Sequence, residues 1–372
     1  MIFKINKREF LDALAVAAKG ISSSTPLPSL NGIKMIANNN DLTIISSDTN
    51  ISIKISIVRN EERNNLNITE EGEIVIEAKY LLEIVRKIDS EYINLETFDN
   101  AIVKIYGGNS EFKINAMNSS DYPYINFDIN KTTFKFSTYN FLKIVEETSF
   151  ACSDKDTRPI LTGVNFKASG GKLYVNATDS YRLASKTVSL DEDLEFNITI
   201  PRKYLLDIAH SITNIEEIEI CIDNQKIIFM FNNTIIQTRL LDDEFPDVSK
   251  LIPASFTQKL VVKAKDLSSA IDRSSFIKAD GKNIVKLSIS ETKVDITASG
   301  SNGSSYENID VVSFEGKPFE ISCSGKYLID ALKALSADEI VMSFSGELKP
   351  LIITDKTDES VVQLISPVRT YK

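Results

Sequence analysis

The segment AKYLLEIVRKI (residues 78–88) decides the fold, because two close variants of it follow: PRKYLLDIAHSI at 201–212 and SGKYLIDALKAL at 324–335. Each has the apolar spacing of an amphipathic helix that docks one face on a sheet. Three lysines open the copies, 124 and then 123 residues apart: Lys79, Lys203 and Lys326. The chain has 372 residues, three times 124, so the spacing predicts one unit written three times.

Composition is that of a globular protein. Hydrophobic residues make up 42% and charged residues 25%, and the length leaves room for two or three domains of roughly 100–200 residues each. The N-terminal MIFKINKREF alternates like a strand rather than a signal peptide, and no segment approaches the roughly 20 apolar residues of a membrane helix. We therefore expect a cytoplasmic protein with no membrane contact and with reduced, buried thiols at Cys152, Cys221 and Cys323.

The repeat extends beyond the helices. Each copy follows a strand-like run, precedes three more, and closes on a proline: Pro123, Pro246 and Pro367. A second strand-and-helix pattern fills the other half of each third, at 1–20, 133–151 and 259–277. The patterns predict an α+β fold of three similar domains, each of two strand–helix–three-strand halves, at 1–127, 128–253 and 254–372. The alternative is that similar helices arose by chance in an αβ protein.

The polar faces of the repeated helices carry bases. Seven residues after each opening lysine stands another basic side chain: Arg86, His210 and Lys333. Two interpretations are open. Glu83, Asp207 and Asp330, one turn into the helices, can be salt-bridge partners on an ordinary solvated face. Alternatively, the recurrence indicates a positive surface that contacts phosphates without reading bases, despite a net charge of −10.

Signals for catalysis are weak. His210 is the single histidine, so no histidine-based triad or His-rich metal site is expected, and no glycine-rich phosphate loop occurs. The acidic run at 242–244 can be imagined as a two-metal cluster, but it precedes Phe245 and Pro246 and is typical of a solvated turn. We predict no catalytic residue, metal or cofactor. A protein-binding repeat scaffold and a metal-dependent nuclease or phosphatase are the competing hypotheses.

Several motifs in order give the chain a resemblance to a known family: TPLPSLNGI (25–33), DKDTRPILTGVNF (154–166), ATDSYRLA (177–184), EFPDVSKLIP (244–253) and ISPVRTY (365–371). The whole chain resembles the bacterial DNA polymerase III beta subunit, the sliding clamp. The resemblance implies a head-to-tail homodimer that closes into a ring, with antiparallel sheets outside and helices lining a central channel. It implies a processivity factor that encircles double-stranded DNA, slides without sequence specificity, and is an accessory subunit rather than an enzyme.

The resemblance implies three sets of functional residues. The DNA-facing set is Lys79, Arg86, Lys155, Arg158, Lys203, Lys326 and Lys333. The dimer interface would use Phe112 and Ile114 on one side and Phe276 and Ile277 on the other, all expected to be exposed in a monomer. A cleft would bind short apolar motifs of the replicative polymerase catalytic subunit, the clamp loader, other polymerases and repair proteins.

The matching cleft positions are Leu161, Thr178, Ser180, Tyr181, Arg182, Leu183, Pro246, Lys250, Leu251, Leu364, Ile365, Ser366, Pro367, Val368 and Arg369. Aliphatic walls, a proline edge and a few cations suit a peptide anchor. Without the resemblance, Leu161, Leu183 and Ile365 also fit an ordinary core. Two positions depart from the family pattern: Tyr181 stands where histidine is frequent, and Ser24 stands where some relatives carry a basic DNA contact.

Overall fold

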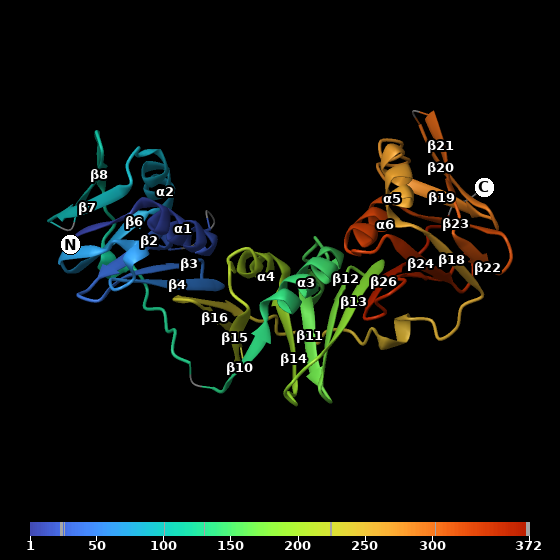
Figure 1. The fold of residues 1–372 in the computed structure, drawn as a ribbon, viewed down its shortest axis with the longest axis horizontal. Helices are drawn as coiled ribbons and strands as arrows, with labels where there is room; N and C mark the ends of the chain where they lie inside the picture. Colours follow the sequence, from blue (N-terminus) through green and yellow to red (C-terminus); the bar gives the residue numbers. More distant parts are fainter. Residues whose placement is uncertain are drawn as a thin grey trace. The chain divides into compact units, whose positions relative to one another are not determined.

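A computed structural model describes residues 1–22, 25, 27–99, 101–129, 131–223, 225–301 and 303–369. The chain divides into two compact units (Figure 1). Unit 1 comprises Met1–Tyr139 and Asp207–Leu240, and unit 2 comprises Asn140–Leu206 and Leu241–Lys372. The middle third of the sequence is therefore shared, because some of its strands join a sheet of unit 1 and the others join a sheet of unit 2.

The described residues form six α-helices, one in each predicted half. Their bounds are α1 Lys7–Ala17, α2 Ala78–Lys87, α3 Thr138–Thr148, α4 Arg202–Ala209, α5 Ala264–Arg273 and α6 Gly325–Lys333. Each helix follows a strand and leads into three more, so the predicted order of elements is confirmed. Two short strands, β5 (Asn67–Glu70) and β22 (Ser313–Glu315), were not predicted.

Unit 1 holds two antiparallel sheets in its described part. The five-stranded sheet runs β5, β1 (Ile2–Asn6), β7 (Tyr92–Phe98), β8 (Ile102–Gly107), β9 (Ser110–Asn115). The eight-stranded sheet runs β10 (Thr133–Ser137), β15 (Glu217–Ile222), β16 (Lys226–Phe231), β17 (Thr234–Arg239), β4 (Ile51–Val58), β3 (Asp41–Ser47), β2 (Gly32–Ala37), β6 (Gly72–Glu77). Helices α1 and α2 lie side by side in this unit (Figure 1).

Unit 2 also holds two antiparallel sheets among its described residues. The nine-stranded sheet runs β14 (Phe196–Pro201), β11 (Gly163–Ser169), β12 (Lys172–Thr178), β13 (Arg182–Ser189), β26 (Val361–Ile365), β25 (Leu351–Asp355), β24 (Glu339–Phe344), β18 (Gln258–Lys263), β22. The four-stranded sheet runs β21 (Gly303–Asp310), β20 (Lys293–Gly300), β19 (Ile284–Ile289), β23 (Phe319–Ser324).

The first strand of each half pairs with the strands of the other half in the same third. Thus β1 pairs with β7, β10 with β15, and β18 with β24. Conversely, β6 pairs with β2, β14 with β11, and β23 with β19. This exchange of strands ties two similar halves into one domain.

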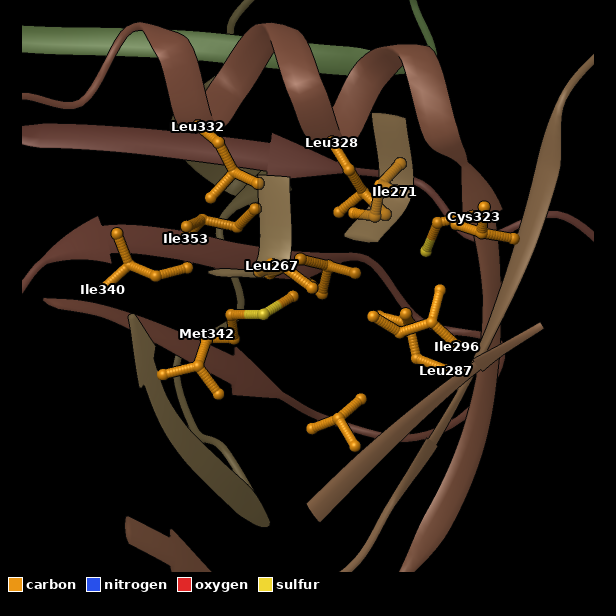
Figure 2. Close-up of a cluster of buried hydrophobic side chains, with 14 of the residues drawn as sticks. Leu267, Ile271, Leu287, Ile296, Cys323, Leu328, Leu332, Ile340, Met342 and Ile353 are labelled. Atoms are coloured by element: carbon orange, nitrogen blue, oxygen red, sulfur yellow. The ribbon is translucent and has the colours of Figure 1, made fainter. Parts of the chain in front are cut away.

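The apolar face of each helix closes a core. In the last third, α5 and α6 contribute Leu267, Ile271, Leu328 and Leu332 to a cluster with side chains from both sheets of unit 2 (Figure 2). The strand side chains labelled there are Leu287, Ile296, Cys323, Ile340, Met342 and Ile353. Complete burial of such side chains stabilises a domain by about 1.5–3 kcal/mol each.

The predicted apolar stripe of the first repeated helix is wrong at one position. Leu81, Ile84, Val85 and Ile88 are buried, but the Tyr80 ring is 52% exposed. The prediction for cysteine is confirmed, since Cys152, Cys221 and Cys323 are free and buried. Burial raises the pKa of the Cys152 and Cys323 thiols to about 12.

Candidate nucleic-acid and partner interfaces

The predicted DNA-facing side chains are all solvent-exposed. Lys79 and Arg86 lie one heptad apart on α2 of unit 1, so they share one face of that helix. Lys326 and Lys333 share the corresponding face of α6 in unit 2. The remaining three are Lys203 on α4 and Lys155 and Arg158 in the segment between α3 and β11.

The acids in the first and third repeated helices have different partners. Glu83 accepts from Arg86 at 2.7 Å and from Lys87 at 3.3 Å, as the solvated-face interpretation predicts. Asp330 instead pairs with Arg182, which lies on β13. Asp330 therefore turns away from the bases of its own helix, and neither Lys326 nor Lys333 forms an ion pair with any described residue.

Several predicted cleft residues meet in one buried apolar cluster in unit 2. Leu161, Leu183 and Leu364 contact each other together with residues that the sequence analysis missed: Ile160, Phe245 and Val248. The strands β13 and β26 hold two of them, because Leu183 pairs with Leu364, next to the pair of Arg182 and Ile365. Continuation of the pairing brings the Ser366 amide to the Tyr181 carbonyl oxygen at 2.9 Å.

The surface over this cluster is partly apolar. Tyr181 is 64% exposed and Leu251 is 49% exposed, although both are large hydrophobic side chains. Ser180, Lys250 and Arg369 are also exposed, while four further residues are half-buried: Pro246, Ser366, Pro367 and Val368. Thr178 and Ile365 are buried. The predicted cleft residues thus fall into two groups, one buried and one exposed or half-buried.

Arg182 is a buried cation, and each of its three side-chain nitrogens donates a hydrogen bond. Its side chain is 6% exposed, Nε donates to Asp179 Oδ2 at 3.0 Å, and Nη1 donates to Asp330 Oδ2 at 2.6 Å. Nη2 donates to the Phe150 carbonyl oxygen at 2.7 Å, and the Tyr327 ring lies 4.5 Å from the guanidinium carbon. Burial, followed by the charge of Asp179, raises the pKa of Tyr327. Arg182 therefore connects the β12–β13 turn to α6.

A second ionic cluster lies along the same strand. Lys186 Nζ is 3.0 Å from Glu147 Oε2 and 3.3 Å from Asp358 Oδ2, and Lys143 is 3.7 Å from both carboxylates. Burial raises the pKa of Glu147, an effect that the Lys186 ammonium opposes. Burial also acts to raise the pKa of Asp358, but the hydrogen bonds from Ser360 and the Lys186 charge outweigh it and lower the pKa to about 2.

The four predicted dimer-interface residues differ in exposure. Phe112 and Ile114 lie on the edge strand β9, opposite the buried Ile105 and Val103, so they extend the core to the sheet edge. Phe112 is 37% exposed and Phe276 is 74% exposed. The expectation of exposure is wrong for Ile277, which is 7% exposed in the core of the last third, because α5 ends at Arg273 and the following turn folds inward.

Sequence models of the N-terminal, central and C-terminal domains of the DNA polymerase III beta subunit match residues 1–126, 135–247 and 249–369. The chain belongs to this family. The beta sliding clamp of Bacillus subtilis is 35% identical over 378 residues, covering 100% of both chains. That of Staphylococcus epidermidis is 34% identical over 376 residues, again covering 100% of both.

Solved structures agree with this assignment to the beta clamps. The crystal structure of the DNA polymerase sliding clamp from Bacillus subtilis has a TM-score of 0.94 at 35% identity, covering 100% of both chains. The DNA polymerase III beta chain of Streptococcus pneumoniae has a TM-score of 0.95 at 33% identity, covering 99% of this chain and 100% of that one. The chain therefore has the three-domain sliding-clamp fold of the processivity factors of DNA polymerase III, accessory subunits without catalytic activity of their own.

The structure describes only one of the two positions that depart from the family pattern. Tyr181 is exposed two residues before Leu183 of the apolar cluster, whereas Ser24 lies outside the described residues of this beta clamp. Asp242, Asp243 and Glu244 are exposed in their turn. Within the described ranges, no group of acidic, histidine and cysteine side chains is arranged to hold a metal ion, and no helix has the length and apolarity to span a bilayer.

Proposed function

We propose that two copies of this chain close head to tail into a ring that encloses double-stranded DNA and slides along it without sequence specificity. In this proposal each copy contributes three domains, at 1–127, 128–253 and 254–372. The ring tethers the replicative polymerase catalytic subunit, the clamp loader, other polymerases and repair proteins in the cytoplasm, and it carries no cofactor.

The repeated pairing of strands supports the dimer most directly. The last strand of a first half pairs with the last strand of a second half in the next third: β4 with β17, and β13 with β26. Two strands of this kind remain at sheet edges, β21 and β9. If β21 of one chain pairs with β9 of a second chain, the pattern continues, and two such contacts between two chains close a heterologous ring.

The side chains next to these edges suit such an interface. Phe112 and Ile114 offer apolar surface beside β9, and Phe276 offers it at the end of α5, which contacts β21. Ile277 would contribute indirectly, because it anchors the residue next to Phe276 in the core. Burial of the exposed Phe276 ring in the dimer would contribute about 2 kcal/mol per interface.

The exposed bases support weak, non-specific contact with DNA. Phosphate contacts by lysine and arginine carry no sequence information and allow sliding. Each such contact is salt-dependent, so enclosure rather than affinity has to retain the protein on DNA. The proposed contacts are Lys79, Arg86, Lys155, Arg158, Lys203, Lys326 and Lys333.

The apolar cluster and its surface support the partner site. Tyr181 and Leu251 form exposed apolar surface over a rigid floor that includes Leu161, Leu183 and Leu364. A short apolar segment of a partner can bury this surface, with Lys250 and Arg369 at the polar rim. Aromatic and aliphatic anchors of this kind supply most of the binding energy in small interfaces.

Retention on circular DNA tests the enclosure. After loading by the clamp loader, the protein should stay bound to a nicked circle at moderate salt and dissociate when a restriction enzyme linearises it. A matched variant, Phe276→Asp, should sediment as a monomer and fail to be retained, because it introduces a charge into the interface. Equal retention on linear and circular DNA, or an unchanged dimer for Phe276→Asp, would overturn the proposal.

A further inference from the structure

We propose that Asp330, on helix α6, is a positioning residue for the partner-peptide site. It acts through Arg182 and Asp179 on the turn that carries Tyr181. The proposal rests on the partner site proposed above. It assigns a role in partner binding to a side chain that lies on the other side of Arg182 from the apolar cluster.

The turn before β13 is held in a strained backbone conformation. Ser180, the residue before Tyr181, has φ +76°, a region that non-glycine residues seldom adopt. Such a conformation persists only where surrounding contacts over-determine it. The contacts here come from Asp179, whose Oδ1 accepts from the Tyr181 amide at 2.9 Å and from the Arg182 amide at 3.0 Å.

Asp179 is in turn oriented by Arg182. Its second carboxylate oxygen accepts from Arg182 Nε at 3.0 Å, so one carboxylate links the backbone of the turn to the guanidinium. The guanidinium is fixed from its far side by Asp330 at 2.6 Å and by the Tyr327 ring. Contacts therefore run without a gap from Asp330 to the amide of Tyr181.

This arrangement separates positioning from direct contact. Arg182 is buried, and each of its three side-chain nitrogens already donates a hydrogen bond within the chain, so its main contacts are structural. Tyr181 is exposed beside the apolar cluster, and its carbonyl oxygen also fixes Ser366 in the C-terminal segment. Loss of Asp330 leaves Arg182 under-neutralised, and the turn with Tyr181 and Ser366 becomes less restricted.

A double-mutant cycle tests the proposal with the intact clamp and the cognate polymerase catalytic subunit, immobilised for biolayer interferometry. Asp330→Asn should weaken binding about tenfold, which is within the range of coupling between contacting residues. In a Tyr181→Ala background the same substitution should change affinity less than about twofold, because the residue that it positions is gone. Asp338→Asn, the same charge change at an exposed site after α6, should bind like the wild type.

Two outcomes overturn the positioning role. One is unchanged affinity for Asp330→Asn while Leu251→Asp abolishes binding, which leaves the partner site intact without Asp330. The other is an equal loss in both backgrounds, which indicates general destabilisation. If Leu251→Asp also binds normally, the partner site itself is wrong. Should Asp330→Asn be unfolded at the assay temperature, Tyr327→Leu tests the same guanidinium contact with the same expected cycle.

Discussion

The chain joins neighbouring thirds by two strand pairs that share a backbone arrangement but differ in chemistry. At the first junction, β4–β17 in unit 1, Ile53 pairs with Ile236 and Ser52 with Gln237. The Gln237 side chain accepts from Lys226 at 2.8 Å and donates to the Asn126 carbonyl oxygen at 3.0 Å. This junction relies on aliphatic packing and on the hydrogen bonds of the Gln237 amide; Lys54, opposite Ile235, forms no ion pair among the described residues.

The second junction, β13–β26 in unit 2, is lined with charge. Arg182 and Lys186 stand at the two ends of the paired region, opposite Ile365 and Val361. Each has carboxylates from other elements: Asp330 for Arg182, and Glu147 and Asp358 for Lys186. A buried ion pair adds little net stability, but the loss of one partner is costly. The difference indicates that charge sets position at the junction that carries the proposed partner site.

Removal of one charge should therefore affect the second junction most. Lys186→Met removes the nearer of the two ammonium groups that Glu147 and Asp358 share and leaves only Lys143, 3.7 Å from each, so we expect β26 to open more easily by about 3 kcal/mol. Amide hydrogen exchange over Val361–Ile365 measures this change. The double variant Lys186→Met with Glu147→Leu should recover most of the loss, since no buried carboxylate then lacks a partner. Unchanged exchange in the single variant contradicts a positioning role for charge.

The matching change at the first junction should be smaller. Gln237→Ala removes one neutral hydrogen bond and one that the Lys226 ammonium donates, from a residue that is 9% exposed, and we expect β17 to open more easily by about 2 kcal/mol. The same exchange experiment over Thr234–Arg239 measures it. A loss as large as that of Lys186→Met would remove the contrast between the junctions.

Lowering the pH should also change the stability of the two junctions differently. This effect should be smaller than those of the two substitutions, because the Asp358 side chain is 34% exposed. The raised pKa of Glu147 means that the folded state favours its protonated form, so β26 gains protection as the pH falls through that pKa. The lowered pKa of Asp358 means that its stabilisation, present above its usual value near 4, is lost as the pH falls towards about 2.

Hydrogen exchange between about pH 6 and pH 2, corrected for the intrinsic rates, should thus show a rise and then a fall in the protection of β26. Glu147→Gln should remove the rise, and Asp358→Asn should remove the fall. The protection of β17, which has an amide and aliphatic side chains at its junction, should change less over the same range. Parallel curves for both strands would contradict the distinction.

Much of the fold was predictable because its signals are local. The amphipathic spacing of six segments and the 124-residue repeat locate the helices and order the strands around them. The exchange of first strands between halves was not predictable, because pairing between distant strands leaves no trace in a local pattern. The burial of Ile277 was missed for a related reason, since the point where α5 ends decides which way the next residues point.

Sequence patterns identified the residues of the candidate site but not the role of each residue. Arg182 was predicted to be one of the cations of the cleft, yet its guanidinium donates hydrogen bonds to Asp179, Asp330 and the Phe150 carbonyl oxygen. The signal available was the acid repeated in each helix, Glu83, Asp207 and Asp330, but sequence spacing alone assigns it to its own helix. Equivalent tyrosines differ likewise: Tyr80 is exposed, whereas Tyr327 covers Arg182.

The smallest expected effect is on DNA binding. It follows from the ion pair that Asp330 forms with Arg182 instead of with the bases of its own helix. On α2, Glu83 stays close to Arg86 and Lys87 and partly neutralises them. On α6, Asp330 is engaged by Arg182 at the second junction, so the charges of Lys326 and Lys333 are not offset within the described residues. An uncompensated lysine beside a phosphate releases close to one counterion when DNA binds, whereas a base already paired with a carboxylate releases less.

Lys333→Ala should therefore reduce the slope of log K against log salt concentration by about 0.9, and Arg86→Ala by less. Fluorescence anisotropy with a labelled duplex at several salt concentrations measures both slopes. Lys349→Ala, an exposed lysine in the β24–β25 hairpin, is the control and should leave the slope unchanged. If Arg86→Ala changes the slope as much as Lys333→Ala, the capture of Asp330 by Arg182 has no consequence for DNA. The second junction would then differ from the first only in how it holds the partner site.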